Sequence, residues 1–257
     1  MFEEMYMKYK AVIFDMDGVI FDSERLSLAC WEETAKKFGL TGIERYCDLS
    51  RGVNEAGSAK IFYSLYGENG LTYEECRAEN SRLFHSRYDG GRLPMKKGVT
   101  ELLSYLKEKG WIVGLASSTK EATVTQEIRD AGLMPYFDNL TCGDMLKKSK
   151  PEPDIFLMAC EKLAVKPQEA IIIEDSHNGI RAASRAGAMP VMVPDMMPVT
   201  EEMKELAYKI CKDLLECQDP HAIFNIHGGN NLIAPTASQA EQKLVEKPAD
   251  EIKKDKE

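Results

Sequence analysis

The sequence predicts an α/β fold, namely a doubly wound, Rossmann-like parallel sheet that carries an inserted all-helical cap domain. Four runs of consecutive apolar residues lie at 11–14, 111–116, 170–173 and 190–193. Consecutive rather than alternating apolar positions are typical of strands covered on both faces. Helical patterns separate the later runs, whereas residues 25–93 show helical patterns without a clear strand. The alternation indicates a parallel sheet, and its interruption indicates an insertion.

Each helix expected between these strands is marked by apolar residues three or four positions apart. The stripes lie at 99–106, 124–131, 155–163 and 180–187. Gly110 and Gly132 follow the first two stripes and supply C-terminal stops. In the insertion, a stripe from Leu28 to Phe38 predicts one long amphipathic helix.

These patterns define the expected domains. We predict that residues 1–24 and 94–225 form the Rossmann-like core and that residues 25–93 form the helical cap. We interpret Asp22 or Ser23 as the helix cap that opens the insertion. The segment 226–257 is polar, mixed in charge and poor in aromatic residues. Such a composition buries too little apolar surface to offset the entropy of ordering, so we expect disorder there.

Charge and composition argue against several classes of protein. The chain has 257 residues, 44% of them hydrophobic, and a net charge of −9, so it lacks a basic face for the phosphate backbone of nucleic acid. No segment approaches the roughly 20 apolar residues that span a bilayer. The seven cysteines are scattered without a CxxC pair, which is typical of reduced thiols. We expect a cytoplasmic monomer without nucleic-acid or membrane partners.

Polar residues appear where successive predicted strands end. They are Asp15, Asp17, Ser117, Ser118, Glu174 and Asp175, and Lys150 joins them from just before a helix. Ligands of open parallel sheets bind outside the carboxyl ends of the strands. We therefore expect carboxylates, hydroxyls and one ammonium to meet at a single edge of the sheet.

The pair Asp15 and Asp17 indicates phosphate chemistry. Two carboxylates this close repel each other, and burying both in ionised form is costly unless a cation or a proton relieves them. A magnesium ion held by Asp15 and Asp175 would do so, because magnesium prefers oxygen ligands and binds substrate phosphate. Asp15 can then act as nucleophile, and Asp17 as general acid and then base. Ser117 and Lys150 can contact the phosphoryl group.

Each of these residues also has a simpler interpretation. Ser117 and Ser118, which we assign to phosphate binding, can instead cap the next helix. Lys150 can be a solvated loop charge. Glu174 and Asp175 can lie at a helix N-terminus because of its dipole. Catalysis is favoured by the order of the residues and by their shared position after successive strands.

Four segments resemble the motifs of the haloacid dehalogenase-like hydrolases, in the order and spacing that this superfamily uses. They read "DMDGVIFDSE", "GLASST", "SKPEPDIF" and "IIIEDSHNGIRAASRAGA". The resemblance extends over residues 8–210 and is greatest to the branch that includes β-phosphoglucomutase and small sugar-phosphate phosphatases. It implies a helical cap inserted after the first motif.

The resemblance also implies roles for individual residues. Asp15 would be the nucleophile and Asp17 the acid and base, and Ser117 and Lys150 would contact the phosphate. The magnesium ligands would be Asp15, Asp175, the main-chain carbonyl of Asp17 and, directly or through water, Glu174. Because the dehalogenases lack the second aspartate, Asp17 favours phosphate over halide as the group removed.

One departure from the family pattern bears on the substrate. Where β-phosphoglucomutase has a cap histidine and a cap arginine, this sequence has Ser27 and Glu55. A mutase function is weakened by both changes, and Arg51 is only a displaced substitute for the arginine.

We therefore predict a magnesium-dependent phosphomonoester hydrolase that acts on a small phosphorylated metabolite, a sugar phosphate, through an aspartyl-phosphate intermediate. Two alternatives stay open. One is a sugar-phosphate mutase of the β-phosphoglucomutase type. The other is a non-catalytic regulator that binds magnesium and a phosphorylated metabolite. A degenerate regulator would be expected to lose Asp15, Asp17 or Lys150, and all three are present.

Overall fold

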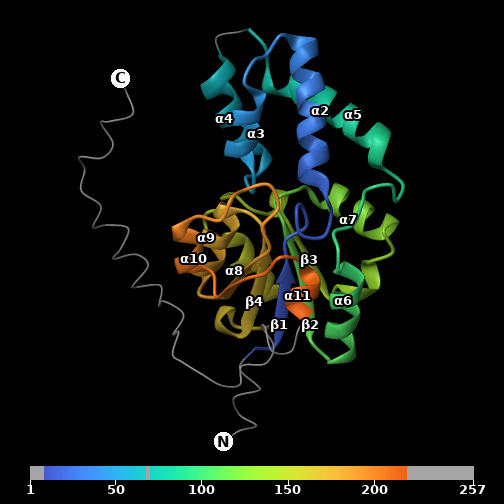
Figure 1. Ribbon diagram of the computed structural model, residues 1–257, viewed down its shortest axis with the longest axis vertical. Coiled ribbons are helices and arrows are strands. Elements are labelled where there is room, and N and C mark those ends of the chain that lie inside the picture. The colour runs from blue at the N-terminus through green and yellow to red at the C-terminus, as the bar shows by residue number, and fades with distance from the viewer. Residues whose placement is uncertain (1–8, 68–69, 219–257) are drawn as a thin grey trace, which may run out of the picture.

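The computed structural model describes residues 9–67 and 70–218 and shows a sheet flanked by helices, with further helices above one edge of the sheet (Figure 1). The sheet is parallel throughout, with six strands in the order β3-β2-β1-β4-β5-β6 among the described residues. The strands are β1 Ala11–Phe14, β2 Ile112–Ser117, β3 Asn139–Cys142, β4 Ala170–Glu174, β5 Met189–Met192 and β6 Lys209–Ile210. The predicted doubly wound α/β fold is confirmed.

The helices around the sheet are α6 Val99–Glu108, α7 Glu121–Asp130, α8 Asp154–Lys162, α9 His177–Ala186, α10 Glu201–Leu206 and α11 Leu214–Gln218. Four of them, α6 to α9, lie close to the predicted stripes, whereas α10 and α11 have no counterpart among the stripes. Short 3-10 turns lie at Met134–Tyr136, Gly143–Met145 and Pro167–Glu169. Helices α6, α7 and α11 contribute to the core on one face of the sheet, and α8 and α9 contribute to the core on the other.

Strand β1 lies at the centre of the sheet, between β2 and β4, and all of its residues are buried. Val12 and Phe14 belong to the core beneath α6 and α7, whereas Ala11 and Ile13 belong to the core beneath α8 and α9. Successive side chains of a strand point to opposite faces. An unbroken apolar run is therefore required here, because both faces are covered by helices.

Two strands have no counterpart among the predicted apolar runs. Strand β3 reads "NLTC", and β6 has only two residues. Both lie at edges of the sheet, where one side of the strand is unpaired and its first residues are only half-buried. The apolar-run criterion misses such strands because edge positions do not require continuous burial.

Four helices, α2 Ser23–Phe38, α3 Ile43–Ser50, α4 Glu55–Tyr66 and α5 Tyr73–Tyr88, lie together beyond the sheet, at the top of Figure 1. They share a hydrophobic cluster of their own. At its centre the ring of Tyr46 lies 4.9 Å from that of Trp31 and 5.7 Å from that of Phe62, both in edge-to-face geometry. Aromatic pairs in this arrangement add to the stabilisation that burial provides.

Two chain segments join these helices to the sheet and run side by side. Asp22 N donates to Pro94 O at 2.9 Å, and Lys96 N donates to Ile20 O at 2.8 Å. Asp22 occupies the N-cap position of α2, but its side chain makes no capping hydrogen bond and pairs with Arg25 instead. The domain boundaries stay a prediction, and segment 226–257 lies outside the described residues.

None of the helices in the described ranges is long and apolar enough to cross a membrane.

Candidate active site

The carboxyl end of β1 carries Asp15 and Asp17 to the edge of the sheet that faces the helical insertion. Asp15 N donates to Ile173 O at 2.9 Å, which extends the pairing with β4 by one residue. Gly18 follows with φ +79°, and a Cβ there would lie 2.4 Å from Oδ2 of Asp175. Glycine is therefore required for two reasons, because the backbone is left-handed and because Asp175 packs directly against it.

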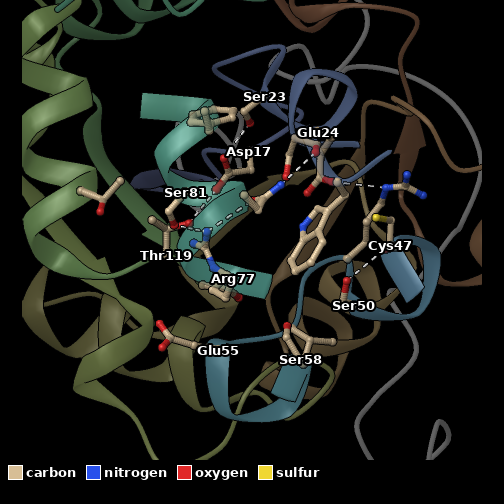
Figure 2. A pocket seen from close by; sticks show the side chains of 18 of the residues that line it. Asp17, Ser23, Glu24, Cys47, Ser50, Glu55, Ser58, Arg77, Ser81 and Thr119 are labelled. Carbon is tan, nitrogen blue, oxygen red and sulfur yellow. Dashed lines mark hydrogen bonds and ion pairs between the residues drawn. The ribbon is translucent and has the colours of Figure 1, made fainter. Parts of the chain in front are cut away.

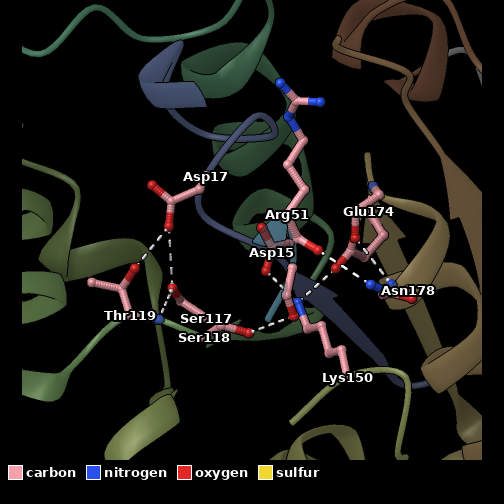
Figure 3. Close-up of polar contacts among 12 residues, drawn as sticks. Asp15, Asp17, Arg51, Ser117, Ser118, Thr119, Lys150, Glu174 and Asn178 are labelled. Atoms are coloured by element: carbon pink, nitrogen blue, oxygen red, sulfur yellow. Dashed lines mark hydrogen bonds and ion pairs between the residues drawn. The ribbon is translucent and has the colours of Figure 1, made fainter. Parts of the chain in front are cut away.

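Lys150 lies at the centre of the site (Figure 3). Its side chain is fully buried, and its Nζ donates to Oδ1 of Asp15 at 2.5 Å and to Oε1 of Glu174 at 2.6 Å. The ammonium also lies 5.1 Å from the centre of the Phe156 ring, within cation–π distance. The interpretation of Lys150 as a solvated loop charge is wrong, because its charge is held inside the protein by two carboxylates.

Glu174 is fixed from both sides. One oxygen accepts from Lys150, and the other accepts from the main-chain N–H of Ser176 at 2.7 Å and from its hydroxyl at 3.0 Å. A Cβ at Gly179 would lie 1.8 Å from Oε1 of Glu174, so the first turn of α9 leaves room for this carboxylate only because residue 179 is glycine. Ser176, and neither Glu174 nor Asp175, is the N-cap of α9.

The carboxylates outnumber the cations in this cluster. Asp15, Glu174 and Asp175 are buried, and one oxygen of each lies within 4.8 Å of the others. Burial raises the pKa of Asp15 and of Asp175 well above its usual range; Glu174 raises both further, and Lys150 opposes the rise. If all three carboxylates are ionised, one ammonium leaves an excess of negative charge, and the raised pKa values of Asp15 and Asp175 reflect the cost of that excess. A set of oxygen donors with excess negative charge fits a divalent cation.

Asp17 points away from this cluster. Its Oδ1 accepts from the Ser23 hydroxyl at 2.6 Å, and its Oδ2 accepts from the Thr119 hydroxyl at 3.0 Å and more weakly from Ser117 at 3.5 Å. Because its carboxylate lines the cavity described below, Asp17 can reach a ligand there without sharing the position of Asp15. Ser23, interpreted from sequence as a helix cap, holds Asp17 instead.

The two serines after β2 have different surroundings. Ser117 is the last residue of the strand and fully buried, and its hydroxyl accepts from Thr119 N at 3.0 Å. The Ser118 hydroxyl donates to the carbonyl of Gly52 at 3.0 Å, across to the helical insertion. Helix α7 has Lys120 as its N-cap, so neither serine caps it. Their assignment to phosphate binding stays a prediction.

A cavity of about 550 Å³ lies between the sheet edge and the helical insertion (Figure 2). The core contributes Asp15, Asp17, Asp175 and the segment from Ser118 to Lys120. Helix α7 contributes Thr123 and Glu127, and the insertion contributes aromatic rings, hydroxyls, carboxylates and the guanidinium of Arg77. Of the predicted site residues, Asp15, Asp17, Ser118 and Asp175 line this space, which is large enough for a small metabolite, whereas Ser117, Lys150 and Glu174 lie behind its wall.

Arg51 also lines the cavity, but its charge is used within the protein. Its side chain is 4% exposed, its Nη1 lies 2.7 Å from Oδ1 of Asp48, and its Nε lies 3.3 Å from Oε2 of Glu24. The Nε contact is an ion pair without hydrogen-bond alignment. The Nη2 group contacts the sulfur of Met196 in the core at 3.5 Å. Arg51 therefore joins the insertion to the core.

Two glutamates on the cavity wall have strongly altered acidity. Burial, followed by the charge of Asp17, raises the pKa of Glu24 to about 7, and Arg51 opposes the rise. Burial, again followed by Asp17, raises the pKa of Glu127 to about 8. Both side chains therefore carry protons for much of the time near neutral pH, which lowers the negative charge of the cavity.

Several residues at this site are absent from the sequence prediction. Thr119 lies two positions after Ser117 in the segment "GLASST". Its position just after a predicted strand is the one sequence feature that could have indicated a place in the site. Arg77 and Glu127 lie within helices, where nothing in the local sequence distinguishes an inward-facing charged residue from a solvated one.

The fold and the site define a class of protein. The core is a parallel α/β sheet with paired aspartates after its central strand and a buried lysine beside them. A helical insertion covers the cavity. These features define a capped α/β enzyme with an aspartate-based site. The family model for haloacid dehalogenase-like hydrolases matches residues 12–193, which is more than half of the chain. The chain therefore belongs to the haloacid dehalogenase-like hydrolase family, and the predicted phosphatase-type enzyme class is confirmed.

Three known proteins illustrate the relationship. A phosphorylated carbohydrates phosphatase of Thermotoga maritima is 34% identical over 181 residues, or 69% of this chain and 82% of that protein. A β-phosphoglucomutase of Bacillus subtilis is 30% identical over 198 residues, or 74% of this chain and 85% of that protein. The crystal structure of CbbY from Rhodobacter sphaeroides with phosphate gives a TM-score of 0.68 at 25% identity, covering 81% of this chain and 96% of CbbY.

Proposed function

We propose that this protein is a magnesium-dependent phosphatase that removes the phosphoryl group of a small sugar phosphate through an aspartyl-phosphate intermediate. The contact between Lys150 and Asp15 carries the proposal. Lys150 holds Oδ1 of Asp15 at 2.5 Å, whereas Oδ2 accepts no hydrogen bond from residues 9–67 or 70–218. One carboxylate oxygen is thus fixed and the other is left for nucleophilic attack.

The proposed reaction has two steps. In the first, Oδ2 of Asp15 forms a bond to phosphorus as the bond to the sugar oxygen breaks, and Asp17 gives its proton to that oxygen. In the second, Asp17 takes a proton from a water molecule, whose oxygen attacks phosphorus and displaces the Asp15 carboxylate. Inorganic phosphate leaves, and both aspartates return to their starting states. Lys150 stabilises the negative charge that Asp15 and the phosphoryl group share.

Magnesium would be held by the carboxylates of Asp15 and Asp175 and by the main-chain carbonyl of Asp17, with Glu174 as a direct or water-mediated partner. When bound, the ion would neutralise the carboxylates and the substrate phosphate. The excess of buried carboxylates over cations at this point supports the assignment. The raised pKa values of Asp15 and Asp175 also support it, because a nucleophilic carboxylate must be ionised and a nearby cation would favour ionisation.

A sugar phosphate is the proposed substrate because of the cavity and the relatives. The cavity wall presents the hydroxyls of Ser27, Ser50 and Ser58, among others, and such groups suit a polyhydroxylated ligand. The Thermotoga maritima relative is named for phosphorylated carbohydrates and the Bacillus subtilis relative for a phosphoglucomutase. Arg51, the displaced substitute for the mutase arginine, is committed to Asp48 and Glu24, which favours a phosphatase over a mutase.

The test is release of inorganic phosphate from a panel of sugar phosphates, measured with magnesium and with EDTA. We expect turnover only with the metal and no detectable turnover by Asp15→Asn. Acid quenching of the wild type during turnover should give a protein one phosphoryl group heavier, and hydroxylamine should remove that group. Asp22→Asn is the matched control, because Asp22 pairs with Arg25 at the surface.

Near wild-type turnover by Asp15→Asn would refute the assignment of the nucleophile. Conversion of a hexose 1-phosphate to its 6-phosphate without release of phosphate would favour the mutase.

A further inference from the structure

Arg77 of helix α5 is a cation of the cavity wall whose charge the protein does not pair (Figure 2). The other long basic side chains on this wall are engaged, since Arg51 pairs with Glu24 and Asp48, and Lys120 lies 2.6 Å from Glu55. Within the described ranges, no carboxylate comes within 4.0 Å of the Arg77 guanidinium. Arg77 therefore differs from its neighbours in having its charge available.

The guanidinium of Arg77 contacts neutral groups, which orient it. Its Nη1 donates to the Ser81 hydroxyl and, at 3.4 Å, to Oδ1 of Asn80. Both partners lie within one turn of α5, and Asn80 is buried and also donates to the carbonyl of Ser27 at 3.4 Å. Guanidinium has five N–H donors in a fixed planar fork. The Tyr73 hydroxyl is a further neutral partner of the guanidinium, so three of the five donors are engaged and two remain for a ligand.

The position of Arg77 relative to the reactive residues defines what these two donors can bind. Asp15 and Asp175 line the cavity from the sheet, whereas Arg77 lines it from the insertion. A ligand whose phosphoryl group meets Asp15 must extend toward the insertion with its other end. The cavity of about 550 Å³ accommodates a metabolite of that kind.

The acidic residues of the cavity do not cancel the attraction that Arg77 offers to an anion. Glu55 pairs with Lys120 at 2.6 Å, and Glu74 accepts from the Tyr63 hydroxyl at 2.7 Å. The pKa of Glu127, raised to about 8 by burial and by Asp17, makes that side chain largely neutral at pH 7. Arg77 therefore remains a cation of this wall without a carboxylate partner among the described residues.

We propose that Arg77 binds a second anionic group of the substrate, at the end remote from the phosphoryl group that is removed. The substrate class is then a sugar phosphate that carries an additional phosphate or carboxylate. This inference rests on the proposed function, since it assigns the far end of the same substrate. A guanidinium recognises either anion through two parallel hydrogen bonds, so the experiment must separate the two groups.

The experiment compares paired substrates that differ only in the second anion. Fructose 1,6-bisphosphate is paired with fructose 1-phosphate, and 6-phosphogluconate with glucitol 6-phosphate, in which a hydroxymethyl group replaces the carboxylate. We expect Arg77→Gln to lower the ratio of kcat/KM within a pair by roughly 10- to 100-fold, the range for a lost hydrogen-bonded charge contact. Arg77→Lys should restore part of the ratio by returning the charge. The pair that responds shows whether the second group is phosphate or carboxylate.

The control variant is Arg82→Gln, which removes an arginine of the same helix that is 63% exposed and paired with Glu79. It should leave the ratios at wild-type values. Equal losses for both members of each pair in Arg77→Gln would show a packing role and overturn the inference, as would unchanged ratios.

The same compounds are also titrated calorimetrically against Asp15→Asn, which binds without turning over. The double variant Asp15→Asn/Arg77→Gln is titrated in the same way. If the wild type releases no phosphate but the double variant binds the doubly anionic compounds more weakly than Asp15→Asn does, with no change for the singly anionic ones, the proposed function fails and the inference about Arg77 stands. If binding does not depend on Arg77, the inference fails whatever the turnover.

Discussion

Replacing Lys150 by methionine tests whether the site is organised by buried charge. Methionine keeps the length and apolar stem of lysine but removes the ammonium. The ammonium lies 2.5 Å from Asp15 and 2.6 Å from Glu174, and its side chain is 0% exposed. Breaking a buried ion pair by removing one partner costs about 3–5 kcal/mol, because it leaves uncompensated charge. We therefore expect Lys150→Met to lower the free energy of unfolding by about 3–5 kcal/mol at pH 7 in the absence of divalent cations.

The loss should shrink when the negative charge is relieved in another way. Glu174→Gln combined with Lys150→Met removes one of the repelling carboxylates and should recover part of the stability, which a double-mutant cycle would measure as a coupling energy. Lower pH should act likewise, since protonation neutralises the remaining carboxylates. Urea unfolding followed by tryptophan fluorescence gives each free energy.

The control for this experiment is Lys10→Met, which removes an ammonium from an equally short contact. Lys10 lies 2.6 Å from Glu169 but is 51% exposed, and exposed ion pairs contribute little. We expect its unfolding midpoint to stay close to that of the wild type. A Lys150→Met protein within about 1 kcal/mol of the wild type at pH 7 would refute the reasoning, because no buried pair would then have been broken.

Two further predictions concern the same cluster. The first concerns pH. Without divalent cations, Asp15 and Asp175 contribute their full stability below pH 3.8, and this contribution is lost as the pH rises toward their raised folded pKa values. The reason is that the unfolded chain releases protons that the folded carboxyls keep. Urea unfolding across this window should show the fall and a smaller fall for Asp175→Asn, whereas equal slopes would contradict it. Gly179→Ala places a Cβ 1.8 Å from Oε1 of Glu174 and should lose about 1–3 kcal/mol through overpacking, together with phosphatase turnover. Gly67→Ala, whose Cβ would lie 3.9 Å from Cβ of Tyr63, should match the wild type. A stable, active Gly179→Ala would show that Glu174 can move without consequence.

The parts of this molecule that sequence predicts well are those for which burial imposes one composition. Strand β1 is covered on both faces, so only an unbroken apolar run such as 11–14 satisfies it. The residues next to that run must lie at the sheet edge, which is why the rule for strand ends brings Asp15 and Glu174 together. The assignment of Lys150 to the site rested only on its place in the order of the motifs, because the loop that carries it has no periodic pattern.

The parts that sequence did not predict depend on contacts between distant segments. Thr119 is 102 positions from Asp17, and the hydroxyl that holds this carboxylate looks in sequence like any serine or threonine of a loop. Ser23 has the composition of a helix cap but uses its hydroxyl on Asp17. Arg77 differs from the solvated arginines of α5 only in the direction of its side chain, which the tertiary packing of the insertion decides.

The helical insertion and the reactive residues are held by the same chain segments. Gly52, with φ +70°, places its carbonyl against the Ser118 hydroxyl at 3.0 Å, and a Cβ on it would lie 2.7 Å from Oγ of Ser176. Ser118 adjoins Ser117, and Ser176 holds Glu174.

The other end of the insertion is coupled to the site as well, because Ser23 begins α2 and donates to Asp17 at 2.6 Å. A rotation of the insertion about its two connections would have to change the Gly52 contact, the Ser23 contact or both. A rotation that breaks the Ser23 contact would release one oxygen of Asp17, so movement of the insertion and the orientation of the proposed acid and base are coupled through this hydrogen bond.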